Sequence, residues 1–163
     1  MEREIQRMEI STYGLCIVSD QYFRDFQSIR HVSNKYEQRP YFLAIKEENG
    51  IIWLIPLSSQ VEKYRAKIEA DEKKHGESLY QYIARVKGKD SAFLIGNAIP
   101  VTDRYIVKPF TVNGIPFVIQ DKTDTRKITS KLKRYLTLVE KGIVKPAVDI
   151  LDIKNKLLEQ KNN

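Results

Sequence analysis

Apolar and polar residues form short blocks along the chain, and the clearest of these runs from Arg39 to Lys67. Two apolar runs, Pro40–Lys46 and Ile51–Leu57, flank Asn49-Gly50. Asn-Gly between apolar runs predicts a β-hairpin, in which both turn residues take a positive φ. The second strand leads into Ser58-Ser59 and then into a segment with helical spacing.

This segment predicts a helix that begins at Ser59 and buries Val61, Tyr64 and Ile68. Ser59-Gln-Val-Glu62 matches a capping box, in which Ser59 accepts from a backbone amide. Lys63 and Lys67 then follow Ser59 at i+4 and i+8 on one face. Hydroxyls and free amides at a helix start also suit a phosphate. The cap and the anion site are compatible, because a hydroxyl both accepts and donates.

The other blocks predict a mixed order of strands and helices. Tyr13–Val18 is typical of a buried strand, and Tyr22, Phe23, Phe26 and Ile29 recur at helical spacing after Ser19-Asp20. The remaining predictions are a helix over Leu79–Val86 toward Gly88, strands at Ala92–Ile95 and Ile99–Val101, a second hairpin over Phe110–Ile119 around Asn113-Gly114, and helices at Thr123–Lys141 and from Pro146 to Glu159.

This order favours an α+β fold: a small, curled antiparallel sheet or barrel with inserted and C-terminal helices. A length of 163 residues suits a single domain over 1–163. No window resembles a membrane span or a signal peptide. The single cysteine, Cys16, lies in an apolar run, which favours a core position in a reducing, cytoplasmic setting.

A net charge of +7 points toward a polyanion, and the distribution of charge locates a candidate surface. Six basic residues and one acid, Asp124, lie between Lys122 and Arg134. In the predicted helix, Lys127, Lys131 and Arg134 share the face opposite the apolar residues. This face would bind RNA phosphates, or it would serve solubility alone.

The sequence lacks the motifs that several enzyme classes require. The seven glycines form neither a P-loop nor a dinucleotide motif, and one cysteine with two distant histidines makes zinc improbable. The acids form no cluster suited to two-metal chemistry, so no metal and no cofactor is expected. Ser, Tyr, Lys and Arg remain. These residues suit metal-free cleavage of RNA by its own 2′-hydroxyl, where donors stabilise charge on the transition state.

Three segments, and the order in which they occur, resemble the toxins of type III toxin–antitoxin systems. This family includes ToxN, AbiQ and CptN, and CptN is the most similar subfamily. The segments are Ser19-Asp-Gln-Tyr22-Phe, the stretch from Tyr36-Glu-Gln-Arg-Pro through Trp-Leu-Ile-Pro-Leu-Ser58-Ser59 to a lysine-bearing helix, and Phe93-Leu-Ile-Gly-Asn97-Ala-Ile-Pro100-Val. The similarity covers roughly residues 13 to 140.

The resemblance implies a compact, highly twisted β-barrel like that of the MazF and Kid toxins. It also implies a metal-independent endoribonuclease that leaves a 2′,3′-cyclic phosphate on cellular or phage RNA. Such a toxin processes the repetitive precursor of its antitoxin RNA. The folded repeats, which are pseudoknots, then bind and inhibit it in closed assemblies.

The resemblance also implies site residues. Tyr36 matches an active-site tyrosine of the family, which positions the ribose or bears a proton, and Ser58 and Ser59 match its Thr/Ser-Ser pair. Arg39 and Lys63 stand near positions where the family has lysines, and we expect them to stabilise negative charge. The expected RNA-binding residues are Tyr22, Lys67, and the basic residues Lys127, Lys131 and Arg134, and we expect nearby Tyr and Phe side chains to stack on unpaired bases. The general base stays unassigned.

Two other functions fit the same residues. A non-catalytic RNA-binding protein would use the same basic faces, and a protein-binding module would carry the positive charge incidentally.

Overall fold

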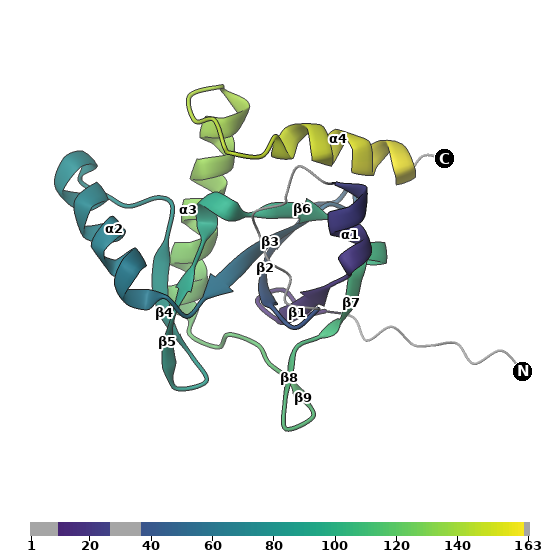
Figure 1. Ribbon diagram of the computed structural model, residues 1–163, viewed down its shortest axis with the longest axis horizontal. Coiled ribbons are helices and arrows are strands. Elements are labelled where there is room, and N and C mark those ends of the chain that lie inside the picture. Colours follow the sequence, from purple (N-terminus) through teal and green to yellow (C-terminus); the bar gives the residue numbers. More distant parts are fainter. Residues whose placement is uncertain (1–9, 27–36, 162–163) are drawn as a thin grey trace, which may run out of the picture.

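The computed structural model describes residues 10–26 and 37–161, and its centre is a seven-stranded antiparallel sheet (Figure 1). The strands follow the order β4-β5-β3-β2-β1-β7, and β6 also pairs with β3. They are β1 (Leu15–Val18), β2 (Pro40–Lys46), β3 (Ile52–Ser58), β4 (Tyr82–Val86), β5 (Lys89–Phe93), β6 (Ile99–Val101) and β7 (Ile106–Pro109).

The predicted β2–β3 hairpin is confirmed, but its turn differs from the prediction. Gly50 has a φ of 93°, whereas Asn49 is not among the residues with positive φ. The amide of Gly50 donates to the carbonyl of Glu47 at 3.2 Å, and the Asn49 Oδ1 accepts from the amide of Ile51 at 3.0 Å. The connection is therefore longer than a two-residue turn, and only its glycine is left-handed.

The far edge of β3 pairs with two strands in succession. β6 pairs with Ile52–Leu54, and β5 pairs with Leu57 and Ser58. A 3₁₀ turn, η2 (Ile95–Asn97), joins β5 to β6. The end of β3 therefore lies against the β4–β5 hairpin, so residues that follow β3 lie near that hairpin.

The predicted helix over Leu79–Val86 is wrong. The segment forms β4, which pairs with β5 through a turn at Lys87-Gly88, both with positive φ. Leu79, Ile83 and Val86 fit a helical spacing, but burial alternates from Ala84 through exposed Arg85 to Val86, as in a strand.

A closed barrel is not confirmed. Among the described strands β4 and β7 each have a single neighbour, so the sheet stays open. A short helix, α1 (Asp20–Asp25), follows β1, and the hydroxyl of Tyr22 donates to the carbonyl of Pro100 in β6 at 2.7 Å. This bond connects the β1 side of the molecule to β6 without strand pairing.

Three longer helices complete the fold (Figure 1): α3 (Lys122–Glu140) and α4 (Ile150–Lys161) contribute side chains to the core, whereas α2 (Val61–His75) lies beside the β4–β5 hairpin. The apolar stripe of α3 is buried as predicted, at Ile128, Leu132, Tyr135 and Val139, with Leu136 partly exposed. α4 begins four residues after Pro146, where Asp149 accepts from the amide of Asp152 at 3.1 Å. None of the described residues of α2 is buried, so its expected apolar face is only half covered.

The second predicted hairpin is present but short. β8 (Thr111–Val112) pairs with β9 (Ile115–Pro116), and Asn113 and Gly114 both take positive φ. A 3₁₀ turn, η3 (Asp103–Tyr105), leads from β6 to β7.

The core lies between the sheet and the helices, with Trp53, Phe42 and Phe93 among its largest side chains. Cys16 is fully buried, as expected, and burial raises the pKa of its thiol to about 12. Within the part of the chain that is described, no helix is long and apolar enough to cross a bilayer.

Candidate active-site cleft

A cleft of about 410 Å³ opens where β3 ends. It lies beside the β2–β3 and β4–β5 hairpins and the start of β8. Its lining residues are Leu15, Gln38, Arg39, Pro40, Leu57, Ser58, Ser59, Val86, Lys87, Lys89, Asp90, Ser91 and Phe110. Three of the five predicted catalytic residues, Arg39, Ser58 and Ser59, therefore meet in one cleft.

Arg39 precedes β2 and is half-buried. Its Nη2 donates to the carbonyl of Leu57 at 3.2 Å, one residue before Ser58. Because Tyr41 pairs with Pro56 at this end of the hairpin, the bond holds the guanidinium at the end of β3. A fixed cation beside two hydroxyls is suited to an anionic oxygen.

The two serines differ in exposure and in their hydrogen bonds. Ser58 is half-buried, and its Oγ accepts from the amide of Gln60 at 3.1 Å, whereas Ser59 is exposed. The predicted N-cap at Ser59 is wrong, since the cap residue is Gln60, which makes no side-chain cap bond. The reason is that β3 continues through Ser58, which delays the helix until Val61.

Lys63 and Lys67 do not line the cleft. Both are exposed on α2, and their Nζ atoms lie 5.2 and 5.3 Å from the centre of the Tyr64 ring. The delayed start of α2 shifts its residues relative to Ser59, so the predicted stacking of Lys63 above Ser59 does not form.

Lys87 and Lys89 enter the cleft in their place. The pairing of Ser58 with Ala92 brings the β4–β5 turn next to the serines. The Nζ of Lys87 lies 5.1 Å from the ring centre of Phe110, another residue of the cleft. Neither lysine was among the predicted site residues, because the helix predicted over Leu79–Val86 lacks the β4–β5 turn that carries them.

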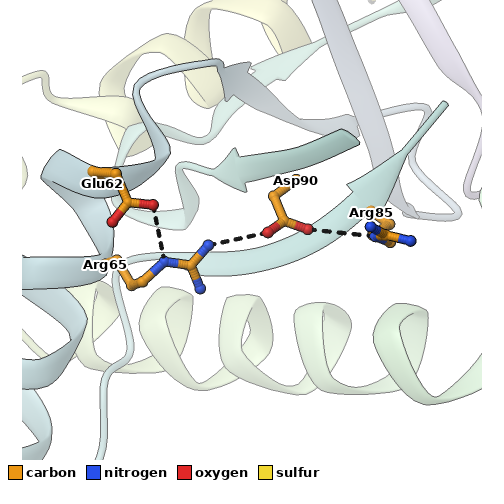
Figure 2. Close-up of polar contacts among 4 residues, drawn as sticks. All are labelled: Glu62, Arg65, Arg85 and Asp90. Atoms are coloured by element: carbon orange, nitrogen blue, oxygen red, sulfur yellow. Dashed lines mark hydrogen bonds and ion pairs between the residues drawn. The ribbon is translucent and has the colours of Figure 1, made fainter. Parts of the chain in front are cut away.

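A chain of ion pairs joins the first turn of α2 to the β4–β5 hairpin (Figure 2). Arg65 contacts Glu62 at 3.4 Å and Asp90 at 3.1 Å, and Asp90 also contacts Arg85 at 3.7 Å. Each pair is exposed and contributes little stability by itself. Together they fix the orientation of Asp90, whose carboxylate is engaged by two guanidinium groups.

One predicted RNA-binding residue, Tyr22, does not line the cleft. Tyr22 belongs to the core: its side chain is 0% exposed and packs against Phe23, Phe26 and Tyr105. The structure does not support Tyr22 as an RNA-binding residue, because its ring is already covered by these neighbours. Tyr36 lies outside the described residues.

The predicted basic face of α3 is only partly available. Lys131 is half-buried and donates to the carbonyl of Ser78. Arg134 pairs with Glu77, with 2.7 Å between Nη1 and Oε2. Lys127 is exposed. Two of these three cations therefore attach α3 to the segment after α2.

The cleft supplies hydroxyls and cations with one carboxylate, that of Asp90. Among residues 10–26 and 37–161, no three His, Cys, Asp or Glu side chains gather as a metal site.

Comparison with solved structures shows what the fold is similar to. One is AbiQ, a lactococcal anti-phage endoribonuclease of the type III toxin–antitoxin system, at a TM-score of 0.68 and 17% identity, covering 94% of this chain and 100% of that one. Another belongs to a bacterial antiviral system that a processed non-coding RNA regulates, at a TM-score of 0.63 and 15% identity, covering 88% and 96%. No family model and no curated protein matches the sequence.

Proposed function

We propose that the protein is an endoribonuclease toxin of a type III toxin–antitoxin system and that the cleft at the end of β3 cleaves RNA. The observation that carries this proposal is the meeting of Arg39, Ser58 and Ser59 with Lys87 and Lys89 in one cleft. The fold shared with AbiQ, itself an endoribonuclease, supports it.

The proposed reaction is an internal transesterification. The 2′-hydroxyl loses its proton and its oxygen attacks the adjacent phosphorus, while the bond from phosphorus to the 5′-oxygen breaks. The leaving 5′-oxygen gains a proton, so the products carry a 2′,3′-cyclic phosphate and a 5′-hydroxyl. Charge grows on the non-bridging oxygens, and donors fixed around them lower the barrier.

Five residues of the cleft have roles in this scheme. Ser58 and Ser59 donate hydrogen bonds to the non-bridging oxygens, and Arg39 places its positive charge beside them. Lys87 and Lys89 neutralise the scissile phosphate or its neighbour. Tyr36 keeps the role that the resemblance implies, positioning the ribose or bearing a proton. The proposed chemistry needs no metal, because Arg39, Lys87 and Lys89 supply positive charge at the phosphate.

The proposed partners are RNAs. The substrates are cellular or phage transcripts and the precursor of an antitoxin RNA, and its folded pseudoknot repeats inhibit the protein in a closed assembly. The second structural neighbour belongs to a system that a processed non-coding RNA regulates, which supports an RNA partner.

A second candidate is a non-catalytic RNA-binding protein. One observation favours it: the single carboxylate of the described cleft, that of Asp90, is already engaged by Arg65 and Arg85. A protein that binds RNA without cleaving it would need the cations and hydroxyls of the cleft but no proton acceptor.

Serine substitution separates these two functions. In Ser58→Ala/Ser59→Ala we expect the cleavage rate to fall about 100-fold or more, as for loss of transition-state donors, while RNA affinity changes little. Ser11→Ala is the matched control, because Ser11 is exposed and outside the cleft. Wild-type cleavage by the double variant would refute the site, and the absence of cleavage by the wild-type protein would favour the RNA-binding function.

The role of the β4–β5 turn has its own test. We expect Lys87→Met/Lys89→Met to lower the cleavage rate at least tenfold, and Lys145→Met, an exposed position outside the cleft, to leave it unchanged. Equal cleavage rates for Lys87→Met/Lys89→Met and the wild-type protein would show that neither lysine takes part in the mechanism.

A further inference from the structure

A groove of about 740 Å³ lies between α2 and α3, with β4 at its base, and the cleavage scheme does not use it. Figure 1 shows the two helices on the same side of the molecule as the β4–β5 hairpin. α2 provides Glu69 and Glu72, and α3 provides Arg126 and Lys127.

The walls of the groove carry opposite charges that do not neutralise each other. Glu69 and Glu72 are exposed on α2, and Arg126 and Lys127 are exposed on α3. In the described part of the chain, no ion pair is found for any of the four. The groove is therefore open to a ligand that carries an anion on one side and hydrogen-bond donors on the other.

The base of the groove offers an aromatic ring in a fixed orientation. The hydroxyl of Tyr82 donates to Asp124 at 2.8 Å, which ties β4 to the start of α3. Burial, followed by this hydrogen bond, raises the pKa of Tyr82 to about 12, so the hydroxyl stays a donor. Ile68 and Ile83 add apolar surface beside it. A flat, apolar ligand is thus accommodated between the charged walls.

Two residues of the groove have buried polar atoms without partners. Ser78 is 4% exposed, and its Oγ has no hydrogen-bond partner among the described residues. The same holds for the Oε1 of Gln81. A buried polar atom left unpaired costs about 1–3 kcal/mol. These atoms are closed to solvent, so a ligand in the groove contacts the exposed residues of its walls instead.

We infer that this groove binds one unpaired nucleotide of an RNA strand, with guanine as the preferred base. Its phosphate lies against Arg126 and Lys127, and its base packs on Tyr82. Guanine presents two adjacent N–H donors on one edge, which a carboxylate from Glu69 or Glu72 accepts together. An acidic wall would repel a phosphate, so the acids favour a base at that wall.

The position of the groove connects it to the cleft. Arg65 lines the groove, Asp90 lines the cleft, and their ion pair stands between the two (Figure 2). A single strand that crosses this pair therefore runs from the groove to the cleft. The inference rests on the proposed function, because it takes the bound strand to be RNA.

Binding of uncleavable RNA tests this inference separately from cleavage. The probes are 2′-O-methyl oligonucleotides, one of uridine alone and one with a single guanosine, because methylation removes the attacking hydroxyl. Fluorescence anisotropy gives the affinity of each at several salt concentrations. We expect the wild-type protein to bind the guanosine probe about tenfold more tightly than the uridine probe.

The two walls should respond differently. Arg126→Met/Lys127→Met should lower the affinity for both probes about tenfold. It should also reduce the slope of log K against log salt by about 1–2. Glu69→Gln/Glu72→Gln should leave that slope unchanged and reduce the preference for guanosine at least fivefold. The controls are Glu140→Gln and Lys145→Met, at exposed positions outside the groove.

Two outcomes would overturn the inference. One is equal affinity of the wild-type protein for both probes, and the other is an unchanged preference in the glutamate variant. Failure of the proposed function has a different signature. The wild-type protein would then bind the probes as predicted but would leave unmethylated RNA intact.

Discussion

Replacing Tyr22 by phenylalanine tests whether this residue stabilises the core or contacts RNA. The ring is fully buried, and its hydroxyl donates to the carbonyl of Pro100 at 2.7 Å. This bond connects α1 to β6 across a sheet that does not close. The substitution keeps the ring and removes only the hydroxyl, so its effect reports on this bond.

The size of the effect follows from burial. Loss of the hydroxyl leaves the Pro100 carbonyl without its donor in a region closed to water, which costs about 1–2 kcal/mol of unfolding free energy. For a chain of 163 residues, each kcal/mol lowers Tm by about 2–4 °C. Tyr64→Phe is the control, because Tyr64 is half-exposed and its hydroxyl makes no hydrogen bond within the described residues. Its effect should stay below about 0.5 kcal/mol.

Urea unfolding gives the loss in stability, and anisotropy with RNA gives the affinity. We expect Tyr22→Phe to lower the urea midpoint with an unchanged slope and to bind RNA as the wild-type protein does. A variant with wild-type stability and weakened RNA binding would refute the reasoning and restore Tyr22 as an RNA contact.

The remaining predictions concern single groups outside the cleavage scheme. Burial and a raised pKa should make the Cys16 thiol unreactive toward iodoacetamide in the native protein and reactive in urea, as mass spectrometry would show; rapid labelling of the native protein would contradict its core position. Burial raises the pKa of Glu47, but hydrogen bonds from Trp53 and Lys154 outweigh it and lower the pKa below its usual value. The stability that Glu47 contributes is therefore present above its unfolded pKa and disappears as the pH falls through the lower folded pKa. Glu47→Gln should therefore flatten the loss of stability below about pH 4.3, the usual pKa of a glutamate. Asp90→Asn should cost less than about 1 kcal/mol in urea unfolding, because its ion pairs are exposed, and a larger loss would show that they are coupled.

Parts of the fold follow from local sequence alone. The β2–β3 hairpin was predictable because two apolar runs of similar length flank Asn49-Gly50, and α3 because its apolar stripe repeats at helical spacing. Both signals lie within one element or one turn. The structure confirms both elements, and their apolar residues, such as Phe42 in β2 and Leu132 in α3, are buried.

The mistakes arise where long-range pairing decides the structure. β4 becomes a strand because β5 supplies hydrogen bonds along its whole length, and the same pairing carries Lys87 and Lys89 to the serines. The helix start after β3 was misplaced for a related reason, since pairing with β5 keeps Ser58 in the sheet. Local spacing at Ser59 contains no information on that partner.

The groove between α2 and α3 also could not be predicted from local sequence patterns. The basic residues of α3 were visible in the sequence, but the contacts of Lys131 with Ser78 and of Arg134 with Glu77 depend on where the segment after α2 passes. Only the structure separates cations that hold this segment from cations that remain exposed.

The most direct test of the central claim is the chemistry of the RNA ends produced in excess EDTA. Purified wild-type protein is incubated with a long RNA, and the fragment termini are identified by mass spectrometry, with Ser58→Ala/Ser59→Ala as the control. We predict fragments with 2′,3′-cyclic phosphate and 5′-hydroxyl ends from the wild-type protein, and intact RNA from the variant over the same time. A strict requirement for Mg²⁺, fragments that end in a 3′-hydroxyl, or equal cleavage by the variant would contradict the account.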